Sequence, residues 1–147
     1  MAFKFKYEAL LSYRRHKKEM AELDLAHCLK KINEVEATIQ ELSHLCKTTS
    51  RTIGILMRSG LDGKDLQNYG EFLTALELKI RQKEEEKAGY EREAEEKRSI
   101  LIERHKELKI LEALKEKQKR KWLSEEERRE EQKLGELTMM RYGRDFL

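Results

Sequence analysis

The chain has 147 residues, of which 41% are charged and 7% are aromatic, and it contains no proline. So much charge with so few aromatic residues excludes a compact globular core of ordinary size, and long runs of Glu, Lys, Arg, Leu and Ala favour long helices. The net charge of +3 is small and identifies no class of partner by itself.

A heptad pattern runs through the first part of the chain and predicts a helix from about residue 5 to residue 58. Steps of three and four residues separate the positions that would form one seam on this helix. These seam positions are Tyr7, Leu11, Arg14, Lys18, Ala21, Leu25, Cys28, Ile32, Val35, Ile39, Leu42, Cys46, Thr49, Ile53 and Leu56.

A turn is expected at residues 59–62. Gly60 can adopt the left-handed conformation that closes a helix, because it has no Cβ to clash. Asp62 is suited to cap the start of the next helix, and Leu61 is placed to pack against both helix ends. The sequence therefore predicts two helices that fold back on each other about Leu61.

The second helix is predicted over about residues 63–140, followed by a frayed tail at 141–147. Its seam positions are Leu66, Tyr69, Leu73, Leu76, Ile80, Lys83, Lys87, Tyr90, Ala94, Lys97, Leu101, Arg104, Leu108 and Leu111. Antiparallel pairing about Leu61 sets residues opposite each other when their numbers add to twice 61. The predicted fold is all-α: a single antiparallel two-helix coiled-coil hairpin over 1–147, with an overhanging C-terminal helix end after about Lys119.

Charged residues interrupt both seams. Lys83 and Lys87 face apolar partners, which long lysine stems can cover while the ammonium reaches water. Lys18 opposite Arg104 forms a layer of like charge. We therefore expect the half near the turn to pack more tightly than the half near the chain ends.

Apolar residues lie beside the seam near the turn, namely Leu45, Ile55, Met57 and Phe72. A two-helix hairpin has one narrow stripe to bury, so part of this apolar surface should be exposed. Two explanations stay open: packing around the helix ends, or a partner-binding surface.

The open end of the hairpin is predicted to be basic. Residues 1–20 carry six Lys or Arg against two Glu, and residues 115–121 carry five against one, so each segment has a net charge of +4. A solvated coiled-coil surface would explain such charge, and so would a docking surface for an acidic partner. Nucleic-acid binding is disfavoured, because no aromatic residues are interleaved with these bases.

The sequence indicates no catalytic, metal or cofactor site and no small-molecule substrate. His27 and Cys28 are adjacent and would point about 100° apart on a helix, and no CxxC or HxxxH spacing occurs. Cys28 and Cys46 are expected to be free core thiols. No secretory signal or transmembrane segment is predicted, so we expect a protein inside the cell that reaches a membrane only through a partner.

Three motifs in this order resemble the flagellar FliJ family over nearly the whole chain. They are Phe-x-Phe-x-Tyr-Glu-x-Leu-Leu-x-Tyr-Arg at 3–14, Asn-Tyr-Gly-Glu-Phe-Leu-Thr-Ala-Leu at 68–76, and Glu-Gln-Lys-Leu-Gly-Glu-Leu at 131–137. The resemblance implies a non-enzymatic stalk and general chaperone of flagellar type III protein export. Its implied partners are the hexameric flagellar export ATPase, the export gate membrane protein and export chaperones, at the inner face of the cell membrane.

The resemblance also implies two sets of site residues. The ATPase-binding set would be Arg14, Arg15, Lys18, Lys119, Arg120 and Lys121. The export-gate-binding set would be Leu42, Leu45, Phe72 and Leu76.

Two alternatives remain open beside this interpretation. One is the equivalent stalk of a virulence type III secretion system, which shares the architecture. The other is a coiled-coil scaffold or nucleic-acid-binding protein.

Overall fold

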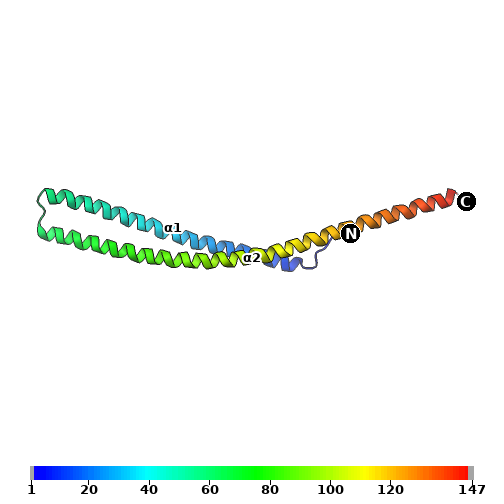
Figure 1. Cartoon of the computed structure of the whole chain (residues 1–147), viewed down its shortest axis with the longest axis horizontal. Helices are drawn as coiled ribbons and strands as arrows, with labels where there is room; N and C mark the ends of the chain where they lie inside the picture. The colour runs from blue at the N-terminus through cyan, green and yellow to red at the C-terminus, as the bar shows by residue number, and fades with distance from the viewer. Residues whose placement is uncertain (1, 146–147) are drawn as a thin grey trace. The chain divides into compact units, whose positions relative to one another are not determined.

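A computed structural model describes residues 2–145 of the chain, which form two long helices and contain no strand. Helix α1 spans Glu8–Arg58 and helix α2 spans Gly63–Asp145. The two pack against each other as a helical hairpin, which confirms the predicted fold class (Figure 1).

The helix ends differ from the expected ones at two places. Helix α1 begins at Glu8, so residues 5–7 precede it, and α2 continues to Asp145 through most of the tail that we expected to fray. Residues 146–147 of that tail lie outside the described part of the chain.

The turn closes α1 by the glycine conformation that the sequence predicts. Gly60 has a φ of 88°, in the left-handed region that residues with a Cβ rarely adopt. Its backbone N–H donates to the carbonyl of Met57 at 3.4 Å, a bond typical of a Schellman-type helix end. The carbonyl of Asp62 accepts from the N–H of Leu66 at 3.0 Å, as expected of the residue that precedes α2.

The hairpin divides into two compact units, each built from segments of both helices. The turn unit is Met20–Leu101, and the terminal unit combines Met1–Glu19 with Ile102–Leu147.

In the turn unit, the seam predicted from the heptads is the buried side of both helices. Its most buried members are Ala21, Cys28, Val35, Ile39, Thr49, Leu76 and Ala94. The ammonium of Lys87 pairs with the carboxylate of Glu36 on the facing helix. Their numbers add to 123, within one residue of the predicted register. The Lys87 stem thus covers the seam while its charge finds a partner at the edge.

The terminal unit contains a core cluster of Phe5, Leu11 and Leu108. Leu11, with 1% of its surface exposed, is the most deeply buried large side chain among the described residues. We expected looser packing here. Residues 2–7, which we call the N-terminal strap, explain the tighter packing. Phe5 and Phe3 of the strap add apolar side chains to a seam in which the two helices alone provide few.

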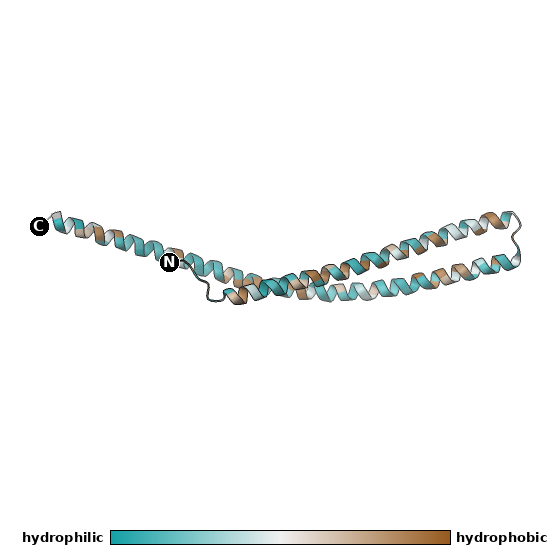
Figure 2. Ribbon diagram, turned by 180° about the vertical axis from the view of Figure 1, so that it is seen from behind, coloured by the Kyte–Doolittle hydropathy of each residue, from teal (hydrophilic) through white to brown (hydrophobic). Residues whose placement is uncertain are grey.

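From Leu123 to Asp145, where its description ends, α2 has no packed partner helix among the described residues and is polar on most of its surface (Figure 2). Pairs of opposite charge three or four residues apart support an isolated helix. One such pair in this stretch joins Arg129 to Glu126 at 3.1 Å, and just before it Arg120 pairs with Glu116 at 3.3 Å. The sequence has no glycine between 90 and 134, so backbone entropy does not oppose this stretch.

Replacing Gly60 with Ala should destabilise the hairpin by about 1–2 kcal/mol, because an L-residue is strained in the left-handed conformation. The control is Gly54→Ala within α1, where an added Cβ would meet nothing within 4 Å. Gly54→Ala should stabilise by about 0.5–1 kcal/mol, since alanine is the better helix former. Urea unfolding followed by circular dichroism measures both, and equal effects of the two substitutions would contradict this account of the turn.

The Glu36–Lys87 pair should make stability depend on pH. A hydrogen bond from Lys87 lowers the pKa of the Glu36 carboxyl, and the same hydrogen bond raises the pKa of Lys87. The contribution of Glu36 is present above the ordinary glutamate pKa and is lost as pH falls through the lowered pKa. The contribution of Lys87 is present below the ordinary lysine pKa and is lost as pH rises through the raised one.

Glu36→Gln should therefore lower the melting temperature slightly at pH 7, with the gap to wild type closing in acid. Glu41→Gln, at an exposed position nearby on α1, is the matched control and should leave the melting temperature unchanged. Thermal unfolding between neutral and acid pH tests this, and a gap that persists in strong acid would rule out the ion pair as its cause.

Candidate functional site

The turn unit has an apolar groove where the two helices meet the turn. The groove has a volume of about 530 Å³ and is lined by Leu56, Leu61, Asp65, Asn68, Tyr69 and Phe72. The seam ends at this groove, and no further layer of side chains covers its last residues. Its lining therefore includes Leu56, Leu61 and Tyr69. These three were predicted as packing residues, and their half-exposure at the end of the seam is what sequence reasoning missed.

The four residues of the expected export-gate set are not equally accessible. Phe72 is 45% exposed and Leu45 is 42% exposed, while Leu42 is half-buried and Leu76 is buried in the seam. Leu45 and Phe72 each come one residue before a seam position. In antiparallel helices, such positions lie on the same side of the seam. A partner could therefore contact Leu45 and Phe72 together, whereas Leu76 is out of its reach.

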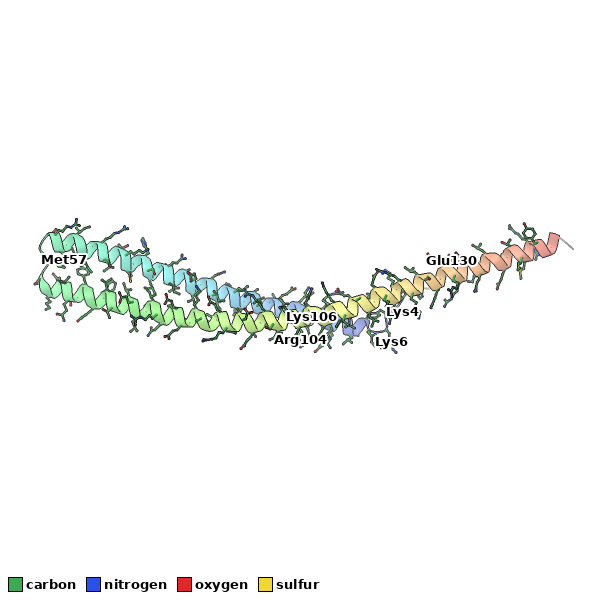
Figure 3. The ribbon with its side chains drawn as sticks, in the orientation of Figure 1. Lys4, Lys6, Met57, Arg104, Lys106 and Glu130 are labelled. Atoms are coloured by element: carbon green, nitrogen blue, oxygen red, sulfur yellow. The ribbon has the colours of Figure 1, made fainter. Side chains whose placement is uncertain are left out.

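Other large apolar side chains near the turn are also exposed. Ile55 is 62% and Met57 is 57% exposed, as the sequence led us to expect, and Met57 projects from the last turn of α1 (Figure 3). Leu66 and Leu78 on α2 are exposed as well. Leu66 is a predicted seam residue, but it lies in the layer next to the turn, where the seam ends.

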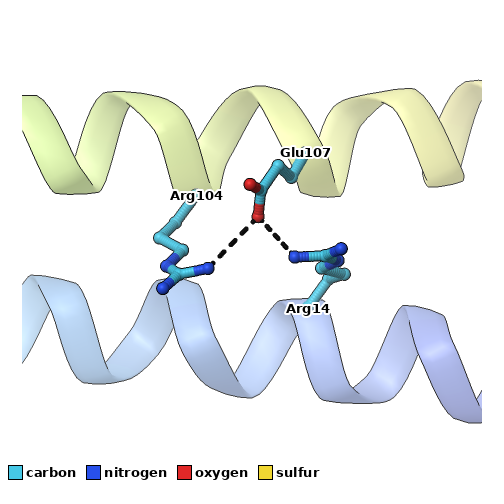
Figure 4. Close-up of polar contacts among 3 residues, drawn as sticks. All are labelled: Arg14, Arg104 and Glu107. Carbon is cyan, nitrogen blue, oxygen red and sulfur yellow. Dashed lines mark hydrogen bonds and ion pairs between the residues drawn. The ribbon is translucent and has the colours of Figure 1, made fainter.

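In the terminal unit, the seam residue Arg14 forms an ion pair with the facing helix. Its guanidinium donates to the carboxylate of Glu107 at 2.6 Å, and Arg104 reaches the same carboxylate at 3.4 Å (Figure 4). One glutamate thus bridges two arginines that would otherwise repel each other in adjacent layers. Glu107 thus also lies beside the layer predicted as Lys18 opposite Arg104, where its negative charge reduces the repulsion between the two cations. Arg14 itself has a partner within the fold.

The other residues of the expected ATPase set differ in how much of their charge is available. Arg15, Lys119, Arg120 and Lys121 are exposed, and Lys18 is half-buried. Arg120 pairs with Glu116 at 3.3 Å. Within the described residues 2–145, Arg15, Lys119 and Lys121 have no ion-pair partner. These three therefore present the most available positive charge of the set.

The sequence model of a protein family described as "Flagellar FliJ protein" matches residues 3–145. The chain belongs to the FliJ family. No curated protein and no solved structure gave a match to accompany it. Membership of the FliJ family makes the chain a component of the flagellar export apparatus, and this family is a non-enzymatic part of that apparatus.

Three further observations concern the described part of this FliJ protein. No group of three or more His, Cys, Asp or Glu side chains in residues 2–145 is placed to hold a metal ion. Over the same residues, neither helix has a stretch long and apolar enough to cross a membrane. Cys28 and Cys46 are free thiols, and the Cys28 thiol donates to the carbonyl of Tyr90 at 3.2 Å.

Proposed function

We propose that this FliJ protein is a non-enzymatic stalk and general chaperone of flagellar type III export. It binds the hexameric export ATPase through basic residues of the terminal unit and the membrane export gate through apolar residues of the turn unit. Through these partners it works at the cytoplasmic face of the cell membrane. The observation that carries this proposal is the family match over residues 3–145.

The exposed apolar residues of the turn unit support the part of the proposal that concerns the gate. Aromatic side chains beside an apolar groove are typical of the residues that dominate binding at protein interfaces. Phe72 lines the groove at the turn and remains 45% exposed, which leaves much of its surface for a partner to bury. Leu45 extends this surface onto α1.

The unpaired cations of the terminal unit support the part that concerns the ATPase. Arg15, Lys119 and Lys121 are exposed and lack internal ion pairs among the described residues. Binding an acidic surface would cost them no existing salt bridge, and long-range attraction would speed the encounter.

The mechanism that follows is mechanical and involves no covalent step. Helices α1 and α2 each contribute residues to both units. A partner that shifts either helix at one unit therefore acts on a helix that continues into the other.

Purification from a motile bacterium tests the function directly: the export ATPase should accompany the chain, and the purified chain should stimulate ATP hydrolysis. An ATPase neither retained nor stimulated would refute the proposal.

Phe72→Ala should weaken gate binding by about tenfold or more, as expected for an aromatic residue central to an interface. The matched control is Leu78→Ala, because Leu78 is 56% exposed on the same helix but lies two positions past the seam residue Leu76. Titration calorimetry with the purified gate protein measures both affinities, and circular dichroism checks the helix content. If both variants bind like wild type, Phe72 does not contact the gate.

Reversing the charges of Arg15, Lys119 and Lys121 together should reduce stimulation of the ATPase by about tenfold at low salt. The loss should shrink as salt rises, because ionic screening weakens the wild-type attraction as well. A triple reversal at the exposed residues Lys30, Lys47 and Lys79 of the turn unit provides the control. Undiminished stimulation at low salt would exclude electrostatic docking of the terminal unit.

A further inference from the structure

The N-terminal strap packs its two phenylalanines against the helices and exposes its two lysines. Residues 3–7 read Phe-Lys-Phe-Lys-Tyr, and they precede the first helix. Residues 6 and 7 form a turn, in which the N–H of Glu8 donates to the carbonyl of Phe5 at 3.3 Å. Phe5 is buried and Phe3 half-buried, while Lys4 and Lys6 are both exposed. The strap therefore presents Lys4 and Lys6 to solvent, while its phenylalanines pack on the helices.

Aromatic and ionic contacts hold the strap in place. The ring centroid of Phe3 lies 6.0 Å from that of Trp122 on α2. Phe5 packs in the core cluster with Leu11 and Leu108, with only 7% of its surface exposed. Directly after the strap, the carboxylate of Glu8, the first residue of α1, pairs with Lys115 at 2.9 Å. These contacts fix the segment that precedes α1.

The strap lies against the basic stretch of α2. Lys4 and Lys115 line a groove of about 370 Å³ together with Phe3, Phe5 and Glu8. Positions 115, 119 and 122 share one face of an α-helix, because they are four and seven residues apart. Lys119 is therefore on the side of α2 that carries the strap contact Trp122, and Figure 3 shows Lys4 and Lys6 alongside this stretch.

Lys4 and Lys6 are also available for binding. Neither takes part in an ion pair within residues 2–145; the ammonium of Lys6 lies 5.7 Å from the ring centre of Tyr7. By contrast, Arg14 and Arg120 are already paired with glutamates. The most accessible positive charge of the terminal unit thus includes the strap, which the expected ATPase set leaves out.

We propose that Lys4 and Lys6 form, together with Lys119, the surface on which the terminal unit binds an acidic face of the export ATPase. This inference rests on the proposed function. Phe3 and Phe5 act as positioning residues, since they hold the lysines before the partner arrives. A flexible segment would lose more conformational entropy on binding and would bind more weakly.

The charge test uses Lys4→Glu/Lys6→Glu, which changes exposed side chains and keeps both phenylalanines. Its affinity for the purified export ATPase should fall about tenfold at low salt, with a smaller loss at high salt. The control Lys30→Glu/Lys47→Glu makes the same charge change at exposed lysines of the turn unit and should bind within about twofold of wild type.

Lys119→Glu/Lys121→Glu separates failure of this inference from failure of the proposed function. If that variant binds weakly while Lys4→Glu/Lys6→Glu binds like wild type, the strap makes no contact and this inference is wrong. If every variant and the wild type show no specific ATPase binding, the proposed function itself is wrong. A loss in the Lys30/Lys47 control equal to that of the strap variant would also overturn the inference, because net charge alone would explain it.

The positioning role has its own readout, since Trp122 is the one tryptophan of the chain. Phe3→Ala should shift Trp122 fluorescence to longer wavelength and lower ATPase affinity, although it removes no charge. Phe3→Tyr should restore both, because it keeps the ring. If Phe3→Ala shifts the fluorescence, keeps the helix content and leaves ATPase affinity at the wild-type value, Phe3 does not position the lysines.

Discussion

A hairpin of two helices has one seam, and the register of that seam decides which side of every residue is buried. The turn sets this register, because Gly60 can close α1 in the left-handed conformation and α2 begins three residues later. Two ion pairs far from the turn in sequence have the same register, since the residue numbers of Glu8 and Lys115, and those of Glu36 and Lys87, each add to 123. A slip of one residue would break these pairs and rotate the seam away from its partner.

A single seam also explains how so much charge is accommodated. Seam positions in a two-helix structure are never far from water, so a long side chain can cover an apolar layer and still reach solvent or an acidic neighbour. Lys87 does this with Glu36. Arg14 and Arg104 do it by sharing Glu107, which lies beside the seam. Each charge is only half-buried, so the desolvation cost stays small and the pairs contribute to register more than to overall stability.

Heptad spacing and turn chemistry were enough to predict the two helices, the turn and the buried side. The strap could not be predicted in this way, because a five-residue alternation such as that of residues 3–7 carries no heptad and its anchor, Trp122, is far away in sequence. The helical C-terminal stretch was underestimated for a related reason. Its order depends on local ion pairs such as Glu126–Arg129, whereas the seam that we followed drifts away there.

In the candidate sites, packing decides which of the expected residues are accessible to a partner. The family resemblance placed Leu76 and Phe72 together as candidate contacts, yet the structure buries Leu76 and leaves Phe72 exposed, because Leu76 is a seam position and Phe72 lies one residue before the seam position Leu73. Likewise Arg14 and Arg15 are neighbours in the sequence, but only Arg14 faces Glu107. A rotation of about 100° between adjacent helical residues thus separates a structural residue from one that a partner can reach. In a one-seam protein, the register that holds the fold together therefore also decides which residues a partner can reach.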